Sequence, residues 1–99
     1  MKVVKLSHPN YEYDVHSLVK AFYAEDQVTV ITPETKPEKL AELEPQVSLE
    51  IELAETGAKI RVGEEDFLWD AETENLADGY KNGLKRFLYR TLSKVTGQK

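Results

Sequence analysis

The last twenty residues constrain the fold more than any other stretch, because they carry a continuous apolar stripe at helical spacing. The stripe consists of Tyr80, Leu84, Phe87, Leu88, Thr91, Leu92 and Val95. Gly97 follows it directly, and glycine is typical of the position at which a helix stops. We therefore predict an amphipathic helix that buries this stripe against another element, with Asn75 or Asp78 as its N-cap.

Residues 47–62 show the period-two alternation that is typical of a β-hairpin. The apolar positions are Val47, Leu49, Ile51 and Leu53, then Ala58, Ile60 and Val62 after a Glu-Thr-Gly turn. In this register Glu50 lies across from Arg61 on the solvent face. Glu52 lies across from Lys59 in the same way, so opposite charges pair between the strands.

Further elements flank the hairpin. Residues 2–7 and 28–31 read as strands, and residues 11–23 read as a helix between them with Asn10 as its N-cap. Residues 67–69 are a candidate short strand before the last helix. The proline-containing connection before the hairpin is expected on the surface, with a helical turn around Glu38–Leu43.

These elements predict an α+β domain with the order β-α-β-β-β-(β)-α. We expect two layers: a mostly antiparallel sheet of four to five strands, and two helices on one of its faces. The first two strands should be parallel, as neighbours or near-neighbours joined by a right-handed crossover. The whole chain, residues 1–99, should form one domain, because 40% hydrophobic and 31% charged residues are ordinary values for a globular protein of this length.

The sequence excludes several classes of protein. It contains no cysteine, so it offers no disulfide framework, no thiolate nucleophile and no cysteine ligand for zinc or an iron–sulfur cluster. No run approaches the roughly 20 apolar residues that cross a bilayer. Residues 1–6 lose their apolar character too early for a signal peptide. We therefore expect a cytoplasmic domain without a membrane partner.

No residue pattern in the sequence predicts catalysis or metal binding. His8 and His16 are the two histidines, and we expect both in surface or capping roles. The acidic residues 64–66 lack the alternating order of a calcium loop, so we interpret them as a solvated turn. Trp69 is interpreted as a cover for the core rather than a ligand platform. We therefore predict no catalytic, cofactor-binding or metal-binding residue.

Residues 84–97, LKRFLYRTLSKVTG, resemble the LKRxLYRxLSxxTG segment of the oxygen-independent coproporphyrinogen III oxidase-like (coproporphyrinogen dehydrogenase) family. The opening of the chain is similar too, with a short strand, a tyrosine-rich helix start and then Leu-Val-Lys-Ala-Phe-Tyr at 18–23. In that family the segment closes an N-terminal domain and leads into a radical-SAM catalytic domain. The resemblance implies that this chain is the N-terminal piece of a longer protein.

The resemblance also implies what the parent protein does. It would use S-adenosylmethionine and a [4Fe–4S] cluster to decarboxylate coproporphyrinogen oxidatively in haem biosynthesis. Such clusters are held by three closely spaced cysteines, and this chain has none. The 99 residues would then be a non-catalytic accessory domain whose partner is the catalytic domain of the same polypeptide.

The outward face of the last helix is the candidate docking site. A helical wheel places Tyr89 opposite the apolar stripe, with Lys85, Arg86 and Arg90 beside it. Tyrosine and arginine are enriched where interfaces carry binding energy. The alternative is that Tyr89 lies over the helix surface, covered by the stems of its basic neighbours.

A nucleic-acid-binding or regulatory module is the alternative function, since the chain has six bases and no acid after Tyr80. Its contacts would be Lys81, Lys85, Arg86, Arg90 and Lys94. The chain as a whole is acidic, with a net charge of −5 and fourteen of its eighteen acids in residues 34–78. Phosphate contacts dominate nucleic-acid affinity, so we do not expect nucleic acid as the partner.

Overall fold

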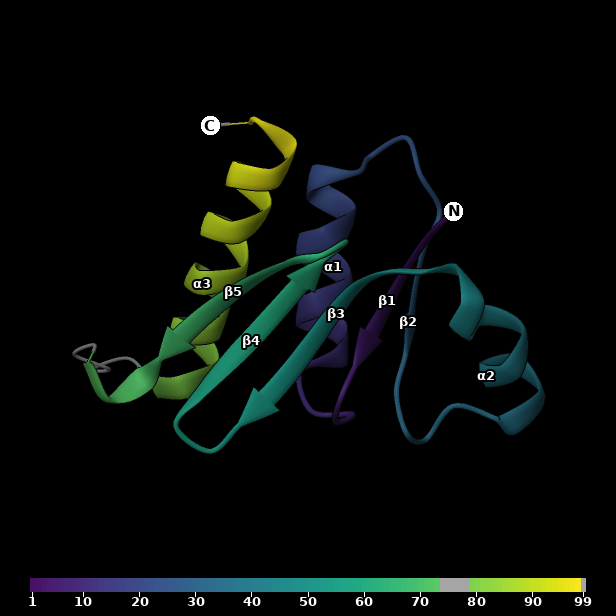
Figure 1. Cartoon of the computed structure of the whole chain (residues 1–99), viewed down its shortest axis with the longest axis horizontal. Helices are drawn as coiled ribbons and strands as arrows, with labels where there is room; N and C mark the ends of the chain where they lie inside the picture. Colours follow the sequence, from purple (N-terminus) through teal and green to yellow (C-terminus); the bar gives the residue numbers. More distant parts are fainter. Residues whose placement is uncertain (74–78, 99) are drawn as a thin grey trace.

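A five-stranded sheet carries the helices of the domain (Figure 1). The computed structural model describes residues 1–73 and 79–98. Its elements are, in order, β1 (Lys2–Leu6), α1 (Glu12–Phe22), β2 (Val28–Ile31), α2 (Pro37–Leu43), a 3-10 turn (Glu44–Gln46), β3 (Val47–Ala54), β4 (Gly57–Val62), β5 (Glu65–Asp70), a second 3-10 turn (Ala71–Thr73) and α3 (Gly79–Thr96). The predicted α+β class, the sheet of four to five strands and the two long helices on one face are confirmed, whereas α2 adds a helix on the opposite face that the two-layer prediction did not include.

The strands are arranged in the order β2-β1-β3-β4-β5. β1 runs parallel to both of its neighbours, β2 and β3, whereas β3–β4 and β4–β5 are antiparallel pairs. The predicted parallel pairing of the first two strands is confirmed, but the sheet is evenly mixed rather than mostly antiparallel. The cause is α2, because a helical connection lets the chain cross β1 and enter β3 in the same direction.

The β3–β4 hairpin has the predicted register, with Glu50 opposite Arg61 and Glu52 opposite Lys59. Lys59 Nζ lies 3.3 Å from Glu52 Oε2, so this cross-strand ion pair forms. Arg61 instead donates to Asp66 on β5, with 2.8 Å between Nε and Oδ1. The charged face is thus a ladder of ion pairs that extends across three strands.

The main core lies between the sheet and the pair α1 and α3, which stand side by side on one face (Figure 1). Its buried residues are Val4, Leu6, Val28, Leu49, Ile51, Ala58, Ile60, Trp69 and Ala71 with Val15, Val19, Leu84, Phe87, Leu88 and Leu92. The predicted apolar faces of the strands and of the last helix are therefore confirmed, except that Val47 packs on the other face of the sheet.

A smaller core lies on the opposite face of the sheet, under α2. It consists of Val3, Ile31 and Leu43, with Leu40 and Val47 packed against them. Successive residues of a strand point to opposite faces, so adjacent Val3 and Val4 enter different cores. β1 is consequently buried on both sides.

The hairpin turn brings Gly57 close to the last strand. A Cβ atom on Gly57 would lie only 2.2 Å from the backbone oxygen of Trp69, so no larger residue fits without a shift of the backbone. The carbonyl of Gly57 also accepts a hydrogen bond of 2.7 Å from the Tyr80 hydroxyl. Gly57 thus fixes α3 against the end of the sheet.

Some of the helix ends agree with those predicted from the sequence, and others do not. Gly97 has a φ of 74°, the left-handed conformation of a helix terminator, so the predicted stop is confirmed. Asn75 and Asp78, the expected caps of α3, lie outside the described residues.

Asn10 is not the N-cap of α1, which is Tyr11 with a φ of 67° and no side-chain capping bond. The helix begins one residue later than expected because the left-handed backbone of Tyr11 lies outside the helical region. The backbone N–H of Asn10 donates to His8 Nδ1 at 3.2 Å. The N–H of Glu12 donates to the carbonyl of Pro9 at 3.3 Å, which satisfies another free donor of the first turn.

Candidate functional site

Tyr89, the centre of the predicted docking face, is held in place by the neighbouring helix. Its ring meets the ring of Phe22 edge-on, with 5.3 Å between centroids and 66° between planes. The side chain is still 48% exposed. Tyr89 thus packs on Phe22 of α1, a contact that neither interpretation included, and about half of the side chain faces solvent.

Lys85 lies on the same side of α3 as Tyr89, since the two are one helical turn apart. Its Nζ is 3.9 Å from Asp14 Oδ1 on α1, and Lys81 Nζ is 3.6 Å from Asp14 Oδ2. Asp14 is thus a member of the site that sequence reasoning missed. The sequence did contain a sign of this contact, because Asp14 precedes the apolar Val15 on a helix that was expected to share a sheet face with the basic last helix.

Arg86 and Arg90 form the next row of the helix surface, again one turn apart. Both are exposed, and each takes part in an interaction within the chain. Arg90 also lines a groove between α3 and β5. The four predicted docking residues are therefore on one outward side of α3, with Lys85 and Tyr89 toward α1 and Arg90 toward β5.

A cluster of aromatic rings supports the start of this helix. Trp69 lies 5.2 Å from Tyr80 and 5.9 Å from Phe87 between ring centroids, and Tyr80 lies 5.9 Å from Tyr11. Trp69 is buried, so its predicted role as a cover of the core is confirmed. The cluster joins α1, β5 and α3, which fixes the orientation of the docking face relative to the sheet.

The two histidines make local structural contacts. His8 Nδ1 accepts the Asn10 N–H described above, and His16 Nε2 lies 3.0 Å from the carbonyl oxygen of Val28 at the start of β2. These contacts agree with the surface or capping roles expected for them. Within residues 1–73 and 79–98, no three histidine or carboxylate side chains gather as a metal-binding group.

The acidic residues 64–66 form a turn and the start of β5. Glu64 and Glu65 are exposed, whereas the carboxylate of Asp66 accepts two hydrogen bonds from Arg61. The hydrogen bond and charge of Arg61 hold the pKa of Asp66 below its ordinary value. Asp66 therefore serves the cross-strand ion pair.

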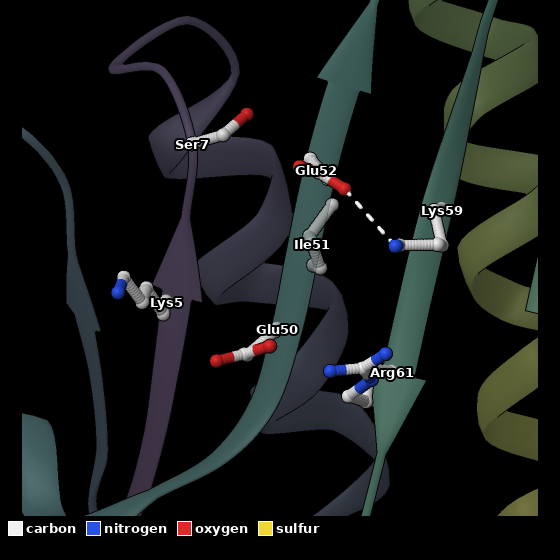
Figure 2. Close-up of a pocket in the computed structure, with 7 residues that line it drawn as sticks. All are labelled: Lys5, Ser7, Glu50, Ile51, Glu52, Lys59 and Arg61. Carbon is white, nitrogen blue, oxygen red and sulfur yellow. Dashed lines mark ion pairs between the residues drawn. The ribbon is translucent and has the colours of Figure 1, made fainter. Parts of the chain in front are cut away.

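A polar pocket of about 230 Å³ lies on the sheet face that carries these ion pairs (Figure 2). Its lining residues are Lys5, Ser7, Glu50, Ile51, Glu52, Lys59 and Arg61. Figure 2 shows the acids and bases alternating across β1, β3 and β4, with Glu50 between Lys5 and Arg61. Opposite charges next to one another give no concentrated field of one sign, so the pocket lacks the character of an ion-binding site.

Two polar side chains that line this pocket, Lys5 and Ser7, already have partners within the fold. Lys5 Nζ lies 2.9 Å from Glu44, whose hydrogen bond and charge raise the pKa of Lys5. The hydroxyl of Ser7 accepts the N–H of Leu53 at 2.8 Å and extends the pairing of β1 with β3. We therefore interpret these polar side chains as structural rather than ligand-binding.

Neither a search of protein-family models nor a search of curated proteins found a match to this chain. In the part of the chain that the structure describes, no helix has the length and apolar character needed to cross a bilayer. The interpretation of the site consequently depends on its geometry and on the sequence resemblance.

Proposed function

We propose that this chain is a non-catalytic accessory domain that docks on the catalytic domain of a cytoplasmic radical-SAM oxidoreductase resembling oxygen-independent coproporphyrinogen III oxidase. The observation that supports it is Tyr89, a half-exposed aromatic ring that a second helix holds in one orientation. The docking contacts are Lys85, Arg86, Tyr89 and Arg90.

Tyr89 is suited to binding because its conformation is restricted before a partner arrives. Ordering a free side chain costs about 0.5–1.5 kcal/mol on association, and the ring contact with Phe22 reduces this cost. Tyrosine also combines a large apolar ring with a hydroxyl that can reach a polar partner. A fixed, half-exposed tyrosine is thus a good anchor for a neighbouring domain.

The charge of α3 indicates the chemistry of its partner. From Tyr80 onward the sequence has bases and no acid, so the facing surface should be acidic. Lys81 and Lys85 both lie against Asp14, which reduces the positive potential available to a phosphate backbone. The geometry accordingly supports an acidic protein surface better than a nucleic acid.

The cofactors of the proposed parent belong to its catalytic domain. S-adenosylmethionine and the [4Fe–4S] cluster would be bound by residues outside this chain, because the cluster needs cysteine thiolates and the chain has none. The accessory domain would contribute position and stability instead of chemistry.

Two experiments test the proposal. The first is to read the gene beyond the codon for Lys99, where a C-x-x-x-C-x-x-C motif is expected. The second compares full-length parent proteins carrying Tyr89→Ala and Tyr13→Ala by limited proteolysis near Gly97. Tyr13 is the matched control because it is an 82% exposed tyrosine on α1.

We expect Tyr89→Ala, but not Tyr13→Ala, to speed cleavage, because an undocked boundary is more accessible to protease. Loss of an interface aromatic commonly costs more than about 1 kcal/mol of association. Tyr89→Phe keeps the contact with Phe22 and should restore most of the protection. Equal cleavage rates in all four proteins, or a gene without the cysteine motif, would refute the proposal.

A further inference from the structure

Among the strands of residues 1–73 and 79–98, β5 pairs only with β4, so its outer edge has backbone groups without a strand partner. Ala71 N–H donates to the carbonyl of Thr56 at 2.7 Å, so these opposite residues form a hydrogen-bonded pair. This pair determines which of the following β4–β5 pairs are hydrogen-bonded and which are not. Because hydrogen-bonded and non-bonded pairs alternate in an antiparallel ladder, Phe67 and Trp69 direct their peptide groups toward β4. Asp66 and Leu68 direct theirs away from the sheet. An edge of this kind is a template for an added strand.

A groove of about 400 Å³ runs beside this edge, between β5 and α3. Its lining residues are Asp66, Phe67, Leu68, Phe87, Arg90, Thr91 and Lys94. The floor is apolar, from Phe67 and Phe87, and the helix wall carries the two basic side chains. Lys94 is exposed and has no ion-pair partner among the described residues.

The two sides of the edge differ in charge. Phe67 and Trp69 point toward the helices, so Asp66, Leu68 and Asp70 point to the opposite face of the sheet. Leu68 is 77% exposed there and lies between the two acids. A strand laid along β5 would therefore meet cations on its helix side, and acids and a leucine on its other side.

We propose that the edge of β5 binds an extended segment of a partner protein by strand addition. The segment carries acidic side chains on alternate residues, which face Lys94 and Arg90 in the groove. Its intervening residues are apolar and face Leu68, because the carboxylate of Asp66 is already paired with Arg61. Backbone hydrogen bonds to Leu68 hold the segment, and the alternating charges select it.

A second copy of this chain does not fit the same edge. Antiparallel pairing of two β5 strands about Leu68, which points its peptide groups outward, would place Asp66 of each copy opposite Asp70 of the other. Like charges directly opposite one another destabilise a sheet. The charge pattern thus favours a heterologous strand.

This inference goes beyond the proposed function and does not depend on it. Tyr89 contacts Phe22 on the α1 side of α3, whereas the groove lies on the β5 side. Arg90 belongs to both surfaces, so the experiment uses Lys94 and Leu68 instead.

The test is an NMR titration of the 99-residue chain with an acetylated, amidated peptide, Thr-Glu-Val-Glu-Val-Glu-Lys. We expect the largest amide shifts at Asp66 and Leu68. Leu68→Pro removes the outward N–H without touching the β4 ladder and should weaken binding about tenfold. Leu68→Thr keeps that N–H and is the control, with binding within about threefold of the parent.

Lys94→Glu gives an independent variant, because an exposed helix position does not determine whether β5 folds. It should also weaken binding about tenfold, as expected when an attractive charge becomes repulsive. The charge-exchanged peptide Thr-Lys-Val-Lys-Val-Lys-Glu should not bind. Equal binding of the two peptides, shifts confined to other strands, or full binding by Lys94→Glu would overturn the inference.

Discussion

Leu88→Ala tests whether α3 is an integral part of the core. Leu88 is 2% exposed in the middle of the buried stripe, among residues of the main core. Truncation removes three carbons, or roughly 2.4 kcal/mol of transfer free energy at about 0.8 kcal/mol for each. The cavity that remains adds to this loss, so we expect a total of about 2–5 kcal/mol. This is a large share of the roughly 5–15 kcal/mol that stabilises a domain.

The assay is urea unfolding followed by far-UV circular dichroism. A loss of this size should move the midpoint by about 1–3 M, because the urea dependence of a small domain is about 1–3 kcal/mol per molar. Leu68→Ala is the matched control: the same substitution at a 77% exposed leucine should cost less than about 0.5 kcal/mol. If the two variants unfold at the same midpoint, α3 does not pack as described.

Two further predictions concern the sheet. Gly57→Ala should lower the free energy of unfolding by about 1–3 kcal/mol, because the new Cβ would clash with the Trp69 carbonyl. The control is Gly63→Asn, at a φ of 63° with no atom near the added Cβ, and its free energy of unfolding should stay within about 0.5 kcal/mol of the parent. Equal losses in the two variants would contradict the steric explanation. Arg61 lowers the pKa of Asp66, so the ion pair stabilises the fold above the ordinary carboxyl pKa and loses that effect as the pH falls through the lowered value. The difference in free energy of unfolding between the parent and Asp66→Asn should therefore be largest near neutral pH and disappear in acid. A difference that persists in acid would refute this assignment. Glu64→Gln, at the exposed acid two residues earlier, is the control.

The hairpin was predictable in detail because alternation on a half-buried sheet leaves one register that buries the apolar residues. The same pattern paired Glu52 with Lys59, as observed. The parallel pairing of β1 with β3 was not predictable from a local period, since it depends on the path of the chain through α2. Adjacent apolar Val3 and Val4 were the available sign that β1 is buried on both faces.

In the candidate site too, features within one element were predictable and contacts between elements were not. The outward position of Tyr89 follows from 100° per residue along one helix, and the structure places it there half-exposed. Its contact with Phe22, and that of Lys85 with Asp14, depend on how two helices lie together on the sheet. No spacing within either helix contains that information.

The interior position of β1 also has a consequence for the order of events during synthesis. β1 leaves the ribosome before both of its neighbours, and one of them, β3, is complete only at Ala54. Until then one edge of β1 has no partner, although α1 and α2, which pack on its two faces, have already been made. Contacts this distant in sequence slow folding, because a long loop must close before they form. A nascent chain that pauses before Ala54 therefore leaves one edge of its central parallel strand unpaired.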